Sequence, residues 1–406
     1  MQSNYKSLGE HIRLVKVKNS DDSVKELLGI NIDKFFMPSV ANIVGTDLSK
    51  YQIVQKNQFA CNRMHVGRDY RIPVAKSDSD FPFIVSPAYD VFEIIDESIL
   101  LPDYLMLWFK RREFDRNAWF YTDADVRGGL HWKAFIEIKL PIPSLEKQKE
   151  LIEEYEAIEN RIQLNKKLCA TLEETAQTIY KHWFEDFEFP DENEKPYQSS
   201  GGEMVECEEL GKEIPKGWRS GKISDLVSTQ YGFTASANFE NGNAKLLRIT
   251  DIVGTMIKWN DVPFCDISEK EFTKYRLAKG DLVISRTGAN VGFAKLILSE
   301  TSDSVFASFL VRLKVENASY QNFVSLKVIS DDYKRFVLSI AEGSAQPQAN
   351  ANILTKMQII IPDDLTGKKF NDFTNPLLEK IEKLSQQIEK LEELKSLLLG
   401  KMAVKV

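Results

Sequence analysis

The chain has few of the residues that build metal centres or disulfide frameworks. Its 406 residues include four cysteines and four histidines, all scattered singly, so it has neither a disulfide pattern nor the spacing of a zinc site. No run of about 18 apolar residues occurs, and no apolar segment follows a basic N-terminus, so we expect neither a membrane span nor a secretory signal. We therefore expect a metal-free protein of the cytoplasm.

A strong positive charge is also missing. The net charge is −7, which at first argues against a nucleic-acid partner. The acidity is local, however: residues 144–213 hold 8 basic and 19 acidic side chains, whereas residues 214–369 hold 20 basic and 16 acidic. Because the local field decides where phosphates bind, the overall charge neither supports nor excludes a DNA partner.

The chain repeats itself at a distance of about 220 residues. "KYQIVQKNQFACNRMHVG" (50–67) is followed much later by "KYRLAKGDLVISRTGANVG" (274–292), so that Arg63 matches Arg286 and Gly67 matches Gly292. "FIEIKLPIP" (135–143) matches "LTKMQIIIP" (354–362) in the same order. A period of this length indicates two copies of a domain-sized unit rather than a solenoid.

Each copy predicts a mixed α/β globular part followed by a long helix. Short apolar runs such as "QFACNR" and "GDLVISR" are bounded by turn residues and predict strands, while 103–116 and 322–339 have helical spacing. The predicted divisions are a first globular domain (1–143), a central long helix (144–189), a linker (190–218), a second globular domain (219–365) and a C-terminal long helix (366–406).

Apolar residues three or four positions apart follow each globular part. This spacing is typical of a coiled-coil seam, and each helix is the obvious partner of the other. We expect an antiparallel coiled coil that gives the molecule pseudo-two-fold symmetry. Pro376 either starts the second helix or interrupts one begun earlier. The predicted seam residues are Ile152, Tyr155, Ile162, Leu172, Ile179, Leu377, Ile381, Leu384, Ile388, Leu391 and Leu398.

Catalytic motifs are absent. "TGANVG" has the small residues of a phosphate loop but lacks its Lys-Ser/Thr, and no nucleophile elbow or methyltransferase motif occurs. A metal-dependent nuclease using Asp103, Glu137 and Lys139 is the enzymatic alternative, but the second copy has Gln358-Ile359-Ile360 where we align Glu137-Ile138-Lys139. We therefore expect a binding protein with no cofactor of its own, and the remaining alternative is a coiled-coil scaffold for proteins.

DNA contacts are expected from basic, amide and aromatic side chains on loops. Arg63 and Arg286 are the strongest candidates, because both follow a strand at the same place in the repeat. The first domain offers Arg63, His65, Arg68, Lys110, Arg111, Arg112, Arg116 and Arg127. The second offers Tyr231, Phe233, Arg248, Arg286, Thr287, Asn290, Ser344, Gln346, Gln348 and Asn350.

Three features together resemble the specificity subunits of Type I restriction–modification enzymes. They are the paired strand-Arg segments with their Val-Gly turns, the passage "GSAQPQANANILTKMQIIIP", and "LPIPSLEKQKELIEEYEAIENRI" at the start of the central helix. The first copy has "DVRGGLHWKAF" in place of the "GSAQP" passage. The resemblance extends over essentially the whole chain.

This resemblance implies a non-catalytic subunit with two target-recognition domains. Each would read one half of a bipartite double-stranded DNA site, while the helices would set the unread spacer. The implied partners are two modification (methyltransferase) subunits and two restriction subunits. S-adenosylmethionine, ATP and Mg²⁺ are then expected in those partners and not in this chain.

Overall fold

The computed structural model describes residues 5–39, 45–64, 66–122, 128–301, 303–341 and 348–403. The chain divides into two compact units, the first made of residues 1–161 and 391–406 and the second of residues 162–390. Each unit contains one globular part and a segment of each long helix. Among the described residues, no helix combines the length and the apolar character that crossing a bilayer requires.

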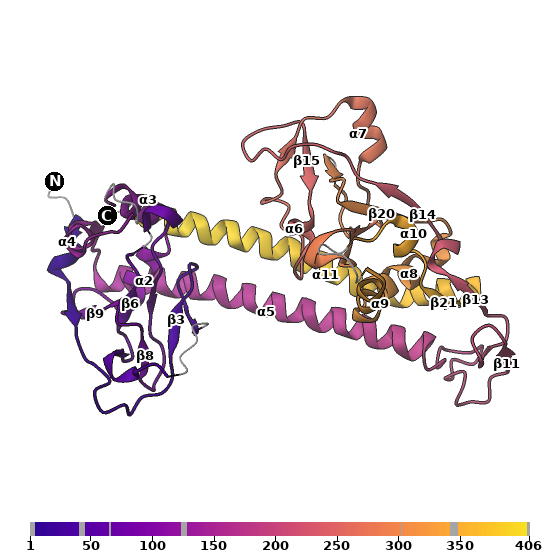
Figure 1. The fold of residues 1–406 in the computed structure, drawn as a ribbon, viewed down its shortest axis with the longest axis horizontal. Helices are drawn as coiled ribbons and strands as arrows, with labels where there is room; N and C mark the ends of the chain where they lie inside the picture. The colour runs from indigo at the N-terminus through magenta and orange to yellow at the C-terminus, as the bar shows by residue number, and fades with distance from the viewer. Residues whose placement is uncertain are drawn as a thin grey trace. The chain divides into compact units, whose positions relative to one another are not determined.

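The first unit is built around a four-stranded antiparallel sheet in the order β2-β9-β6-β7. Two of its strands, β6 and β9, are labelled in Figure 1. All three residues of β6 are buried, so both faces of this strand are covered, and the sequence is an unbroken apolar run. The strands are β2 (Ile12–Val15), β6 (Phe59–Cys61), β7 (Val74–Lys76) and β9 (Asp90–Ile94), and the pairs β1 (Tyr5–Ser7) with β10 (Lys139–Pro141), β3 (Leu28–Ile30) with β4 (Phe36–Pro38) and β5 (Gln52–Val54) with β8 (Phe83–Val85).

Aromatic side chains fill the core beneath this sheet. The rings of Phe59 and Phe92 stack with centroids 5.1 Å apart, and Phe109 and Phe135 pack edge-on against Phe92 at 6.2 and 5.7 Å. The last two come from helices, so this cluster fixes the helices on the sheet. The helices are α1 (Val66–Asp69), α2 (Pro102–Phe109), α3 (Arg112–Phe120) and α4 (Trp132–Glu137), with 3₁₀ turns η1 (Leu8–Glu10) and η2 (Leu48–Lys50).

The second unit contains a four-stranded antiparallel sheet in the order β14-β20-β17-β18. A smaller sheet, β16-β15-β19, covers a second core. The strands are β13 (Arg219–Lys222), β14 (Val227–Tyr231), β15 (Ala244–Leu247), β16 (Phe264–Cys265), β17 (Leu282–Ser285), β18 (Ala294–Leu296), β19 (Ser304–Phe306), β20 (Leu310–Val315) and β21 (Gln358–Ile361). The helices are α6 (Ile249–Ile252), α7 (Glu269–Tyr275), α8 (Gln321–Val328), α9 (Asp331–Ala341) and α10 (Ala351–Leu354), with η3 (Ile223–Asp225), η4 (Gly288–Asn290) and η5 (Ala318–Tyr320).

The two four-stranded sheets have the same topology, which is what a duplicated unit predicts. In chain order β2, β6, β7 and β9 occupy the places of β14, β17, β18 and β20. The closing strand pairs also agree: Ser7 pairs with Lys139 in the first unit, and Lys222 pairs with Gln358 in the second. This register equates Lys139 with Gln358, so the alignment of Glu137 with Gln358 is wrong by two residues.

The segments with helical spacing form helices in both units. Residues 103–116 lie on α2 and α3, which are separated by a break at Lys110 and Arg111, and residues 322–339 lie on α8 and α9. In both units the first helix of the pair is almost wholly buried, whereas the second is amphipathic. The segment 190–218 is more ordered than a linker, because it contains a hairpin of β11 (Met204–Cys207) and β12 (Lys212–Pro215).

The two long helices are α5 (Leu145–Phe184) and α11 (Asp364–Lys401). α11 begins twelve residues before Pro376, which lies inside it, so of the two alternatives the helix begun earlier is correct. The Asp363 side chain caps this start by accepting from the backbone N–H of Thr366 at 2.8 Å.

Within the second unit, α5 and α11 run antiparallel. Asn165 of α5 donates to Gln387 of α11 at 3.3 Å, and the rings of Trp183 of α5 and Phe370 of α11 lie 5.3 Å apart. As residue numbers rise along α5, the numbers of the neighbouring residues on α11 fall. Within the first unit, Lys395 of α11 pairs with Glu159 of α5 at 2.8 Å.

Burial along the two helices follows the predicted spacing with local differences. Of the predicted seam residues, Tyr155, Ile162, Ile381, Leu384 and Ile388 are buried. The predicted Leu377 is only half-buried, and its neighbour Leu378 is buried instead. The other predicted seam residues are half-buried as well: Ile152, Leu172, Ile179, Leu391 and Leu398. Cys169, Ala176 and Tyr180 of α5 are buried as well.

Candidate nucleic-acid interface

In the second unit, three segments far apart in sequence meet beside the four-stranded sheet. They are the end of β14, the turn after β17 and the segment 348–350 before α10. The backbone N–H of Ala349 donates to the carbonyl of Arg286 at 2.9 Å, and Thr287 forms a bridge with Gln348. The hydroxyl of Tyr231 accepts from the backbone N–H of Ala351 at 3.0 Å. Because the predicted DNA contacts Tyr231, Arg286 and Gln348 meet here, we call this arrangement the second reading site.

Arg286 is held at this site by its backbone and by an aromatic ring. Its guanidinium carbon lies 5.1 Å from the centre of the Tyr231 ring. Its Nε is buried and, within the part of the chain that the structure describes, has no hydrogen-bond partner. A nitrogen this buried is closed to solvent, whereas Arg286 as a whole is half-buried. Any contact of Arg286 with a phosphate or a base edge therefore has to come from the rest of its guanidinium.

The amide candidates lie on the same loops. Asn290 ends the 3₁₀ turn η4, directly after Arg286 and Thr287. Gln348 is exposed, whereas the Asn350 side chain caps α10 by accepting from the backbone N–H of Ile353 at 3.0 Å. Ser344 and Gln346 lie outside the described residues. The site thus presents one guanidinium, one tyrosine and several amides from adjoining loops.

Arg248 and Phe233 have contacts of their own within the domain. Arg248 donates to Asp251 through Nε and Nη2 at 3.0 and 2.8 Å, and this hydrogen-bonded carboxylate raises the pKa of Arg248. The ring of Phe233 is half-buried and lies 5.4 Å from that of Tyr275. Both side chains therefore support the fold locally, and their role as DNA contacts stays a prediction.

The first unit repeats the loop arrangement. The backbone N–H of Leu130 donates to the carbonyl of Arg63 at 3.0 Å, in the same way as Ala349 donates to Arg286. The following residue, His131, precedes α4 just as Asn350 precedes α10. The turn after β6 and the segment 128–131 therefore form the equivalent arrangement, which we call the first reading site.

Two glycines bring the loops of the first reading site together. The backbone N–H of Gly67 donates to the carbonyl of Gly128 at 2.7 Å. A Cβ added at Gly67 would lie 2.7 Å from the Cα of Gly128, and Gly128 itself has a φ of +59°. Only glycine permits this approach of two backbones. Gly67, which matches Gly292 in the repeat, is thus needed for the close packing of these two loops.

Arg63 differs from Arg286 in its partners. Its Nε donates to Asp90 at 2.6 Å, a second nitrogen donates to the carbonyl of Leu130, and its side chain is only 18% exposed. The guanidinium also lies 5.6 Å from the ring of Trp132. Arg63 is therefore a positioning residue that ties a strand, a loop and a helix together.

We expect replacement of Arg63 and of Arg286 by alanine to have different effects on the stability of the protein. Arg63→Ala leaves the partly buried Asp90 without its ion pair, so the free energy of unfolding should fall by about 1.5–3 kcal/mol. Arg286→Ala removes a buried, unpartnered donor and should leave stability nearly unchanged while weakening DNA binding. Denaturant unfolding of both variants checks this, and equal destabilisation would contradict it.

The other basic candidates of the first unit occupy different surroundings. Arg68 is exposed and pairs with the neighbouring Asp69 at 2.7 Å. Lys110 lies 4.8 Å from the ring of Tyr155, and burial lowers its pKa. Arg111 is buried against Trp108, 4.1 Å from the ring centre, whereas Arg112 is exposed at the start of α3. His65 and Arg127 lie outside the described residues.

The three residues of the nuclease alternative are not arranged as a metal site. Asp103 forms an ion pair with Lys76 at 2.6 Å, Glu137 ends α4 and Lys139 begins β10. Among the residues that the structure describes, no group of three or more His, Cys, Asp or Glu side chains is placed to hold a metal ion. The geometry therefore gives this alternative no support.

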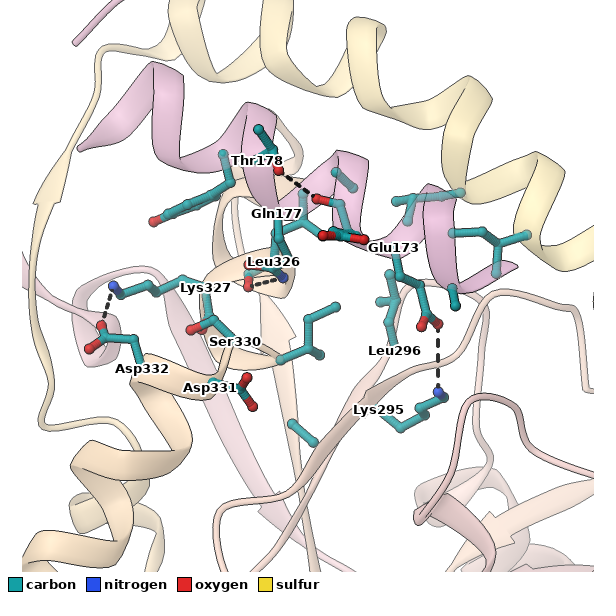
Figure 2. Close-up of a pocket in the computed structure, with 18 of the residues that line it drawn as sticks. Glu173, Gln177, Thr178, Lys295, Leu296, Leu326, Lys327, Ser330, Asp331 and Asp332 are labelled. Carbon is teal, nitrogen blue, oxygen red and sulfur yellow. Dashed lines mark hydrogen bonds and ion pairs between the residues drawn. The ribbon is translucent and has the colours of Figure 1, made fainter. Parts of the chain in front are cut away.

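A cavity of about 780 Å³ lies in the second unit beside α5 (Figure 2). Lys295 lies 4.0 Å from Glu173, Lys327 pairs with Asp332 at 2.7 Å, and Gln177 donates to the carbonyl of Leu326 at 2.9 Å. Burial raises the pKa of Glu173 and lowers that of Lys295. The cavity is thus lined by paired charges, and it is formed by elements other than the loops of the second reading site.

Sequence comparison connects the chain with named proteins. No protein-family model matches it. The Type I restriction enzyme MjaIX specificity subunit of Methanocaldococcus jannaschii is 25% identical over 318 residues, which are 76% of this chain and 70% of that protein. The Type I restriction enzyme HindI specificity subunit of Haemophilus influenzae is 19% identical, over 98% of this chain and 97% of that protein. The chain is a homologue of Type I specificity subunits.

The fold agrees with this relationship. The crystal structure of the Type I restriction-modification system S subunit from M. genitalium matches with a TM-score of 0.53, over 99% of this chain and 96% of that chain at 13% identity. The relatives that the chain resembles are named as specificity subunits of Type I restriction enzymes. The family resemblance identified from its motifs is thereby confirmed.

Proposed function

We propose that this chain is the DNA sequence-specificity subunit of a Type I restriction–modification enzyme. Each of its two globular domains reads one half of a bipartite site in double-stranded DNA. The observation that carries the proposal is the duplicated reading site, in which the carbonyl of Arg63 or Arg286 accepts from a second loop at 3.0 or 2.9 Å. Duplicated readers suit paired sites on a duplex.

The chemistry of the second reading site fits a duplex. Arg286 can donate to guanine or to a phosphate, and Gln348 can pair with adenine through its amide. The ring of Tyr231 supports the guanidinium of Arg286 from one side.

The long helices would set the spacer between the half-sites and dock the partner subunits. We infer an antiparallel coiled coil with pseudo-two-fold symmetry, supported by the Asn165–Gln387 and Trp183–Phe370 contacts. Two modification subunits and two restriction subunits are the proposed partners. S-adenosylmethionine, ATP and Mg²⁺ would be bound by those partners, and this chain would supply recognition only.

Affinity for duplex DNA should fall steeply with salt, because bound cations release counterions from the phosphates. The measurement is fluorescence anisotropy of a duplex of about 30 base pairs with the chain and its methyltransferase subunits between about 50 and 200 mM salt. A protein scaffold without DNA binding would give no signal at any salt concentration, and that result would exclude the proposed function.

A further inference from the structure

The first unit has an exposed cluster of aromatic side chains that the DNA candidates above do not include. We call it the aromatic patch: Tyr70, Trp119, Phe120 and Tyr121, whose exposed fractions are 62%, 44%, 77% and 50%. Their rings are in contact in pairs, with the centroids of Tyr70 and Trp119 5.3 Å apart and those of Phe120 and Tyr121 5.4 Å apart. Exposed apolar surface that is clustered, rather than scattered, marks a binding site.

The aromatic patch lies next to the first reading site in the chain. Tyr70 directly follows α1, the short helix that contains Gly67, and Trp119 and Phe120 form the end of α3. The chain then continues from Tyr121 to Gly128, which contacts Gly67. In the chain, Tyr70 therefore follows the first loop of the first reading site, and Trp119, Phe120 and Tyr121 precede the second.

Tyr70 is held in an uncommon backbone conformation. Its φ is +56°, a value that costs free energy for a bulky side chain. The contact between the rings of Tyr70 and Trp119 joins the segment after α1 to the end of α3. Neither ring belongs to the buried core, so core packing does not account for this arrangement.

The charges around the patch favour DNA over an apolar protein surface. Arg112 and Arg116 are exposed on α3, one turn apart, and Arg68 is exposed on α1. Guanidinium groups beside aromatic rings match a duplex, in which phosphates border bases and sugars. Arg116 and Arg68 each have one acidic neighbour, Glu113 at 3.2 Å and Asp69 at 2.7 Å, and exposed pairs of this kind are weak.

We propose that the aromatic patch packs against base edges and sugars of the first half-site and supplies a share of affinity that salt does not weaken. The inference rests on the proposed function and deepens it. The corresponding helix of the second unit, α9, ends in Ser339, Ile340 and Ala341 and has no aromatic residue there. The two domains therefore read DNA by different chemistry, the first with more apolar contact and the second with Arg286.

The test uses the full chain assembled with its methyltransferase subunits and a duplex that carries the motif mapped by adenine methylation. Phe120→Ala and Trp119→Ala should each weaken binding about tenfold, since truncating an aromatic anchor at an interface commonly costs about that much. The slope of log affinity against log salt should stay unchanged, because no cation is lost. Arg116→Ala should instead lower that slope by about 1.

Phe81→Ala is the matched control, because Phe81 is also 77% exposed and lies between β7 and β8 in the chain, on neither loop of the first reading site. Thermal melting of each variant shows that the domain is folded. Affinity equal to wild type for both Phe120→Ala and Trp119→Ala would overturn the inference. Lost methyltransferase assembly with normal DNA affinity would assign the patch to a protein partner and would overturn it as well. If the wild-type complex itself does not bind the duplex, the proposed function fails first.

Discussion

Replacing Gly67 by alanine is expected to weaken binding to the first half-site by about 10- to 100-fold while the domain stays folded. A methyl group there would lie 2.7 Å from the Cα of Gly128 and 3.0 Å from its carbonyl oxygen. The 2.7 Å hydrogen bond between the two residues must then break. Because this bond joins the two loops of the first reading site, several base contacts, each worth about 1–3 kcal/mol, would be displaced together.

Gly29→Ala provides the matched control, because Gly29 lies in β3 and not on either loop of the first reading site. A Cβ at Gly29 would meet only the Cα of Ser39, at 4.0 Å, which is ordinary contact. Anisotropy titrations with the mapped duplex, together with melting temperatures, compare the two variants. If both bind DNA as wild type does, the Gly67–Gly128 contact does not shape the reading site. If Gly67→Ala unfolds the domain, the contact supports the fold instead.

Lengthening both long helices by one heptad is expected to lengthen the unread gap of the DNA motif by about two or three base pairs, without changing either half-site. Seven residues add about 10 Å to a helix and keep the heptad spacing of its apolar side. The insertion points are after Arg161 in α5 and after Lys390 in α11, where the chain passes from one compact unit to the other. A heptad in one helix only should break the pairing and abolish modification.

The control for this experiment is a seven-residue insertion after Gly201. This glycine is exposed and has a φ of +88°, and a Cβ added to it would meet no other atom within 4 Å. The gap should then be the same as in the wild-type motif. Mapping of methylated adenines measures the gap directly. An unchanged gap in the doubly lengthened variant would show that the helices do not set the spacer.

Much of the fold follows from local sequence signals. The strands β6 and β17 are predicted because each is a short apolar run bounded by turn residues, with Arg63 or Arg286 shortly after it, and the structure buries both strands. The helix pairs α2–α3 and α8–α9 are predicted because residues 103–116 and 322–339 have apolar residues at helical spacing. The duplication is visible because the strand-Arg segments and the closing strands recur in one order, and the two sheets share that order.

Other features depend on contacts that the chain order does not reveal. The spacing of α11 does not distinguish Leu377 from Leu378, since either can face the partner helix, and the structure buries Leu378. The sequence allowed a helix to begin at Pro376, but the structure places this residue inside α11, which begins at Asp364. The polar composition of 190–218 predicts a linker, yet β11 and β12 pair within it.

The reading sites show the same limit. Arg63 and Arg286 occupy equivalent places in the sequence but have different side-chain partners. Arg63 pairs with Asp90, which lies 27 residues further along the chain, and Arg286 does not. The contact of Gly67 with Gly128 joins residues 61 positions apart. The signal that could have found the aromatic patch is the run Trp119-Phe120-Tyr121 directly before the "DVRGGL" segment. Its exposure, however, is a property of the folded domain.

The central claim is that this one chain reads two half-sites at a fixed distance. The most direct test is to express it together with its methyltransferase subunits and to map modified adenines across the host genome by single-molecule sequencing. The account predicts one bipartite motif with a gap of constant length. A well-formed, cofactor-loaded complex that leaves no new methylated motif, or one that modifies a single continuous site, would contradict it.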